Sequence, residues 1–84
     1  GNVPLRIAYL LESFARALGQ QRGEDLLIPV QLNRNEISEM VGARPETVIR
    51  ILSKWQKAGW LISVPDGFLA PKWQGLAARL TNEE

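Results

Sequence analysis

The short joint between two predicted helices constrains the fold of this chain more than any other feature. Asn33 is a residue type favoured just before a helix, and Glu36 stands where an acidic side chain returns the hydrogen bond. That helix is predicted to end at Gly42, a residue type suited to the left-handed conformation that closes helices. Pro45 suits the first position of a new helix, whose positive end Glu46 complements. The second helix therefore starts within three residues of the end of the first.

Each helix of the pair carries apolar residues at helical spacing, so we expect the two to pack against each other. The opposite side of the second helix is then left in solvent, and Gly59 is well placed to end that helix. Trp60 and Trp73 are expected to pack in the core rather than to stack on bases. The expected stripes are Ile37, Met40 and Val41 in the first helix, and Val48, Ile51, Leu52 and Trp55 in the second.

Further elements are predicted on both sides of this pair. Before it, apolar spacing predicts an amphipathic helix from Pro4 to Leu18, and Leu26–Leu32 looks extended, whereas the polar residues between them show no period. After it, two apolar runs flank the turn Pro65-Asp66-Gly67, which predicts a β-hairpin over about 60–70. A closing helix is predicted from Trp73 to Leu80.

The predicted fold is mainly α-helical with a small β-hairpin. Two short helices joined by a tight turn and followed by a hairpin have the order of a winged helix-turn-helix, with a three-helix core, a wing and an additional C-terminal helix. The helix-turn-helix covers about 33–58 and the wing about 60–70. A chain of 84 residues allows one domain, over 1–84.

The composition excludes most enzyme chemistry. The chain has no cysteine and no histidine, so it offers no disulfide, no Cys/His zinc site, no thiol nucleophile and no imidazole base. Glu36 and Glu39 lie on the helix that Asn33 caps and need no catalytic explanation. We expect no catalytic residue, no cofactor and no metal. No apolar run reaches the roughly 20 residues of a membrane span, so a soluble, cytoplasmic protein is expected.

The free side of the second helix carries side chains that suit the major groove of DNA. Glu46 and Arg50 are four residues apart, so they share one face near the helix start. Arginine can donate a pair of hydrogen bonds to guanine, and glutamate can accept one from cytosine. The alternative is an ion pair within the helix on a solvated face. Ile49, on the same face, either meets a thymine methyl group or packs sideways against its neighbours.

Side chains at the two helix starts are candidates for phosphate contacts, which position a protein on DNA without reading sequence. For each, the alternative is a side chain in solvent or, for the asparagine, a helix cap alone. The candidates are Asn33, Arg34, Arg44 and Thr47.

Between Leu32 and Leu61 the sequence contains four runs in a characteristic order. They are Asn33-Arg34-Asn35-Glu36-Ile37, Met40-Val41-Gly42, Arg44-Pro45-Glu46-Thr47-Val48-Ile49-Arg50-Ile51-Leu52 and Lys57-Ala58-Gly59-Trp60-Leu61. With the flanking helix and hairpin, this region resembles the C-terminal DNA-binding domain of the Crp/Fnr family of bacterial transcriptional regulators. The Glu-Thr-Val-x-Arg core is the most specific part of the resemblance.

The resemblance implies roles for individual residues. It implies that Glu46 and Arg50 contact bases in a two-fold symmetric operator and that Thr47 contacts the backbone. The sequence departs from the family at Ile49, where many members carry a small or polar residue, and at Trp60, where leucine is usual. The departure at Ile49 bears on the half-site sequence and leaves the mode of binding unchanged.

The resemblance also implies a longer parent protein. Its N-terminal sensor domain and long dimerisation helix are not contained in residues 1–84, and the start at Gly1 rather than methionine agrees with a piece of a longer chain. The parent is expected to be a homodimer that binds double-stranded, palindromic DNA, with RNA polymerase as a further candidate partner.

Two alternatives remain open at this stage. A winged helix can be a protein-interaction module, which predicts an exposed apolar patch rather than a basic, mostly polar surface around Arg50. It can also be a nonspecific nucleic-acid binder, in which the negative charge of Glu46 only weakens binding.

Overall fold

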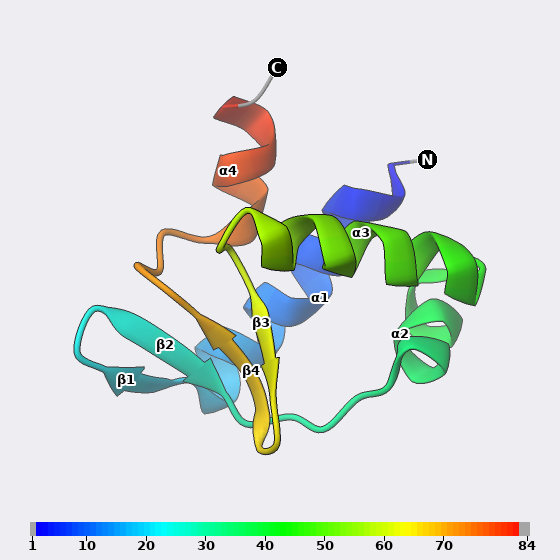
Figure 1. The fold of residues 1–84 in the computed structure, drawn as a ribbon. Coiled ribbons are helices and arrows are strands. Elements are labelled where there is room, and N and C mark those ends of the chain that lie inside the picture. The colour runs from blue at the N-terminus through cyan, green and yellow to red at the C-terminus, as the bar shows by residue number, and fades with distance from the viewer. Residues whose placement is uncertain (1, 83–84) are drawn as a thin grey trace.

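A computed structural model describes residues 2–82, which form four helices and four strands (Figure 1). The expectation attached to the start of the chain at Gly1 lies outside the described residues. This order confirms the predicted winged helix-turn-helix. The elements are α1 (Val3–Leu18), β1 (Gln20–Arg22), β2 (Asp25–Ile28), α2 (Arg34–Val41), α3 (Pro45–Lys57), β3 (Ile62–Val64), β4 (Gly67–Ala70) and α4 (Leu76–Asn82).

The wing is part of a larger sheet than the sequence predicts. All four strands are antiparallel neighbours in the order β1-β2-β4-β3, so β4 pairs with β2 as well as with β3. The polar stretch after α1, in which the sequence shows no period, contains a strand, because Gln20–Arg22 forms β1. Every residue of β1 is exposed, so burial leaves no alternating pattern in its sequence. Backbone pairing with β2 holds it instead.

The turn between α2 and α3 forms as predicted. The Asn33 carboxamide oxygen accepts from the Glu36 backbone N–H at 2.8 Å, and the Glu36 carboxylate accepts from the Asn33 N–H at 3.0 Å. At the other end of α2, Gly42 adopts the left-handed conformation with φ 68°, and Pro45 is the first residue of α3. Three residues, 42–44, therefore separate the end of α2 from the start of α3.

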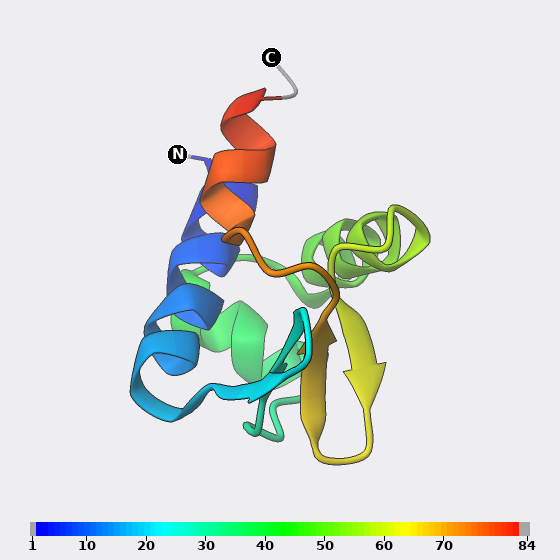
Figure 2. The same cartoon turned by 90° about the vertical axis from the view of Figure 1, so that its left-hand side faces the viewer.

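The core lies where α1, α2 and α3 meet the inner face of the sheet. In Figure 2, α4 runs beside the N-terminal part of α1, and the two helices are in contact. All four residues of the expected α3 stripe are buried, and so are Trp60 and Leu61. The largest fully buried side chains are Trp55, Ile7, Leu11, Ile28, Ile37, Leu76 and Val48.

Two expectations about the core are wrong. Met40 is 55% exposed, because the covered side of α2 runs through Ile37, Ser38 and Val41. The buried Ser38 satisfies its hydroxyl by donating to the Asn35 carbonyl at 2.6 Å. Trp73 is not part of the closing helix, since α4 begins only at Leu76.

The reason for the late start of α4 is the backbone around Trp73. Lys72 and Gly75, on either side of it, have positive φ angles of 47° and 87°, which are incompatible with a continuous right-handed helix. The Trp73 backbone N–H donates to the Glu24 carbonyl at 3.2 Å, and its half-buried side chain packs on the core from this loop.

Candidate DNA interface

α3 presents two different faces. Figure 1 shows it running across the front of the molecule, with α2 beneath its N-terminal end, and in Figure 2 it stands at the periphery, away from α1. One face supplies the buried residues of the core, and the other is open to solvent. The exposed residues of α3 are Glu46, Ile49, Arg50, Ser53, Lys54, Gln56 and Lys57.

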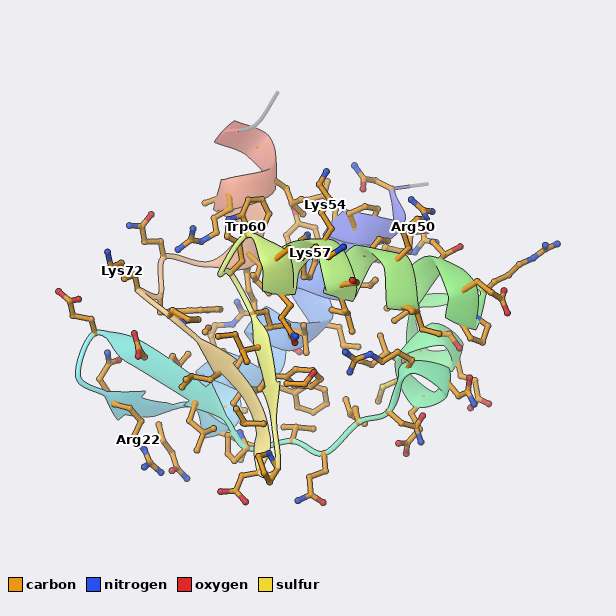
Figure 3. All side chains as sticks on the ribbon, in the orientation of Figure 1. Arg22, Arg50, Lys54, Lys57, Trp60 and Lys72 are labelled. Carbon is orange, nitrogen blue, oxygen red and sulfur yellow. The ribbon has the colours of Figure 1, made fainter. Side chains whose placement is uncertain are left out.

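Glu46 and Arg50 both lie on the exposed face. They are separated by one helical turn, which places their Cβ atoms about 6 Å apart. Both are exposed in the folded chain, so neither the wing nor the described terminal segments cover them. Figure 3 shows Arg50, Lys54 and Lys57 following one another along the same side of α3. The interface around the Glu46–Arg50 pair is therefore polar and becomes basic toward the C-terminal end of the helix.

Ile49 also lies on this face. Its side chain is 52% exposed and is not among the residues that pack against the core. Ile49 is therefore a large apolar side chain that is open to solvent on this face. An exposed isoleucine between Glu46 and Arg50 is the one large apolar group on an otherwise polar face of α3.

The start of α2 is tied to the wing. The Arg34 guanidinium donates to the Ser63 hydroxyl of β3 at 3.1 Å, and the Ser63 backbone N–H donates to the Gln56 side chain of α3 at 3.3 Å. β3 is an edge strand, so Gln56 also covers a backbone donor that pairing within the sheet leaves free. Arg34 is thereby held beside the wing by one of its nitrogens, while its remaining donors stay free for a ligand.

The other predicted phosphate ligands lie at both helix starts. Arg44 is exposed at the position just before α3, and Thr47 is half-buried in its first turn. The carboxamide oxygen of Asn33 is already engaged in the cap of α2, so only its NH₂ group can serve a phosphate. Arg34 is thus the first residue of α2, and Arg44 is the residue just before α3.

Comparison with known proteins identifies the family. The family described as the Crp-like helix-turn-helix domain matches residues 6–79. The chain belongs to this family. The "CRP-like cAMP-activated global transcriptional regulator" of Mycobacterium tuberculosis strain H37Rv is 37% identical over 60 residues, and so is that of strain CDC 1551. The matched part is 71% of this chain and 27% of those relatives, so the chain spans about a quarter of their length.

Solved structures agree with this assignment. The CO-dependent transcription factor CooA from Carboxydothermus hydrogenoformans is similar over 98% of this chain and 36% of its own, with 27% identity and a TM-score of 0.76. Oxidised CprK in complex with o-chlorophenolacetic acid superimposes with a TM-score of 0.81 at 21% identity, over 98% of this chain and 33% of its own. At that identity the likeness shows the fold alone.

The resemblance to the Crp/Fnr family is therefore confirmed, because the Crp-like helix-turn-helix domain matches most of the chain. Within residues 2–82, no helix has the length and apolar composition needed to cross a membrane. No group of three or more acidic, histidine or cysteine side chains in the described part is placed to hold a metal ion.

The Crp-like domain contains contacts at its interface that sequence reasoning missed. Ser63 and Gln56 join the wing to the two helices, as described above. On the opposite side, the Arg6 side chain of α1 donates to the Val41 carbonyl at 2.9 Å and so holds the end of α2 just before the turn. A cation at the carboxyl end of a helix is electrostatically favourable. Only the general preference for basic residues near helix ends could have pointed to Arg6.

The exposed apolar residues of the Crp-like domain do not favour a protein-docking module. The large ones are Tyr9 and Leu18 on α1, Met40 on α2 and Ile49 on α3. They are distributed over three helices, whereas the surface around Arg50 is polar and basic, as a DNA-binding surface requires.

Proposed function

We propose that this domain recognises double-stranded DNA by placing α3 in the major groove, with Glu46 and Arg50 reading one G·C pair. The observation that carries the proposal is the exposure of this acidic and cationic pair, one turn apart near the start of the helix. Arg50 would donate to guanine O6 and N7, and Glu46 would accept from cytosine N4. The buried face of α3 fixes the direction of both side chains from behind.

Phosphate contacts position α3 in the groove. Arg34, held next to β3 by Ser63, and Arg44, just before α3, supply positive charge at the start of each helix of the pair. Thr47 supplies a hydroxyl in the first turn of α3, and Asn33 offers the NH₂ group of its side chain. These groups set affinity and salt dependence rather than sequence preference.

The parent protein is proposed to act as a homodimer on a palindrome. Two copies of α3 related by a two-fold axis reach half-sites about one helical turn of DNA apart. The similarity to a transcriptional regulator supports the further proposal that the parent protein acts in the cytoplasm, with RNA polymerase as a further partner. A domain of this kind has no catalytic role.

Selection from a random DNA pool tests this proposal. Two copies of the chain joined by a flexible linker should enrich a palindrome with a G·C pair at a fixed position in each half-site. Absence of any enriched sequence would contradict the proposal and favour a nonspecific binder or a docking module.

Two variants distinguish residues that recognise bases from residues that contact phosphates. Glu46→Ala should loosen the preference at that one base pair, whereas a nonspecific binder would bind every sequence more tightly once the negative charge is removed. Arg34→Ala should weaken all sites alike and lower the slope of affinity against salt by roughly one. Matched controls remove the same charges elsewhere: Glu39→Ala on α2 and Arg22→Ala on β1, both exposed. Figure 3 shows Arg22 far from α3.

A further inference from the structure

Ile49 lies on the exposed face of α3, and the proposed reading of a G·C pair by Glu46 and Arg50 gives it no role. It is more than half exposed, although it lies in the middle of a helix whose other large apolar residues are all buried. A β-branched side chain is not chosen for helix stability, because alanine or a long polar residue supports an exposed helical position better. Neither the core nor the helix therefore accounts for an isoleucine at this position.

The major groove of DNA displays one apolar group. Each base pair presents hydrogen-bond donors and acceptors there, and only thymine adds a methyl group, at its C5 atom. Glu46 and Arg50 cannot use that group, because both recognise polar atoms. Ile49 can, since its branched side chain is stiff at χ1 and offers an apolar surface in a fixed direction.

The spacing along α3 sets which base pair is within reach. Ile49 follows Glu46 by three residues and precedes Arg50, so all three belong to one helical turn. One turn advances about 5.4 Å, which is less than two base-pair steps of about 3.4 Å. An apolar contact by Ile49 therefore falls next to the base pair that Glu46 and Arg50 read.

We infer that Ile49 recognises the C5-methyl group of a pyrimidine, normally thymine, in the base pair adjacent to that G·C pair. The inference rests on the proposed function and extends it to the base content of the half-site. It also makes the domain a reader of a chemical mark, because cytosine acquires the same methyl group in the same place when it is methylated at C5.

Base analogues that differ by one methyl group test the inference. In the palindrome obtained by selection, each thymine near the G·C pair is replaced by uracil, one position per half-site at a time. At one position, uracil should weaken binding of the two-copy protein about fourfold for each half-site altered, the effect of losing one methyl group that is buried in the complex. Ile49→Ala should bind the thymine and uracil duplexes equally.

A second pair of duplexes measures how much the C5-methyl group contributes to binding affinity when the base is cytosine rather than thymine. At the same position, 5-methylcytosine paired with guanine should bind about fourfold more tightly than unmodified cytosine, again only with Ile49 present. Ile49→Val keeps part of the apolar surface. It should therefore keep part of the affinity ratio of thymine to uracil duplexes and of 5-methylcytosine to cytosine duplexes. Because Ile49 is exposed, thermal unfolding should show Ile49→Ala folded like the parent chain.

The outcomes separate this inference from the proposal on which it rests. An enriched palindrome with no uracil-sensitive position, or with equal sensitivity in Ile49→Ala, overturns the role of Ile49 and leaves the reading by Glu46 and Arg50 intact. An equal loss of affinity by Ile49→Ala on every duplex also overturns it, since the contact is then not to a methyl group. Failure to enrich any sequence overturns both.

Discussion

The two ends of α3 are built for different tasks. Near the N-terminal end, Glu46, Ile49 and Arg50 are exposed and only the backbone direction of the helix constrains them. Near the C-terminal end, Trp55 is 1% exposed and Trp60, just beyond the helix, is 9% exposed. Their ring centroids are 6.4 Å apart, so two aromatic side chains join α3 to the start of the wing.

A residue of α4 covers the Trp60 ring, just beyond the C-terminal end of α3. The Arg79 guanidinium of α4 lies 5.7 Å from the centroid of the Trp60 ring and donates to the Lys72 carbonyl at 3.1 Å. The guanidinium of Arg79 thus covers the large ring of Trp60, which is buried. Aromatic and cationic contacts therefore hold the C-terminal end of α3, whereas the side chains near its N-terminal end are open to solvent.

The largest effect is expected from removing the indole of Trp55, which is buried at the C-terminal end of α3. Trp55→Ala should lower the free energy of unfolding by about 3–5 kcal/mol, because it opens a cavity at the centre of a small core. Urea denaturation followed by circular dichroism measures the change. Ser53→Ala, on the exposed face of the same helix, should change the free energy by less than about 0.5 kcal/mol. Similar losses in both variants would contradict the division of α3 into two faces.

Removing the guanidinium of Arg50 tests the open end. Arg50→Ala should lose about 1–3 kcal/mol of discrimination at the G·C pair of each half-site. Its free energy of unfolding should stay within about 0.5 kcal/mol of the parent value, because the side chain is exposed. Competition binding against duplexes with the pair inverted gives the first quantity and urea denaturation the second. Retained preference for the original pair would assign its recognition to other residues.

The sequence predicts the elements that bury one apolar face, because burial leaves a periodic pattern. It misses the elements that depend on backbone hydrogen bonds or backbone dihedral angles. The core stripe of α3 and the capped turn follow from spacing and from residue types that favour particular backbone conformations. β1 has no buried face and Trp73 lies between two positive φ angles, so periodicity finds neither the strand nor the start of α4. The expectation that Met40 is buried is wrong for a related reason. Ile37, Met40 and Val41 all fit the helical period, but the buried side of α2 contains only the first and the last of them.

The candidate site divides in the same way. The exposure of Glu46 and Arg50 could be predicted, because both lie opposite the apolar stripe of their own helix. The contacts of Arg34 with Ser63 and of Arg6 with Val41 join residues 29 and 35 positions apart, so no local pattern contains them. Local spacing thus predicts which side chains face a ligand, whereas the contacts that hold them depend on the tertiary fold.

A smaller effect is expected from the contact that begins α4. The Glu12 carboxylate of α1 accepts from the Ala77 backbone N–H at 2.7 Å and so caps a helix that supplies no cap of its own. Glu12→Ala should cost about 1 kcal/mol of unfolding free energy and speed hydrogen exchange at the Ala77 amide. Glu39→Ala, an exposed carboxylate on α2, should leave that amide unchanged. Unaltered exchange in Glu12→Ala would mean that α4 is held by apolar packing alone.

The smallest effect is expected where the cation covers the aromatic ring. Arg79→Ala should reduce the free energy of unfolding by about 0.5–1 kcal/mol, the range of a cation–π contact near the surface. Arg79→Lys keeps the charge but loses the planar group that spans the ring and the Lys72 carbonyl, so it should recover only part of the loss. Sequence preference on the selected palindrome should be the same in all three proteins, because the contact stabilises the buried end of α3 without touching DNA. A shifted preference in Arg79→Ala would show that the open end moves when the covered end loosens, and would join the two ends into one unit.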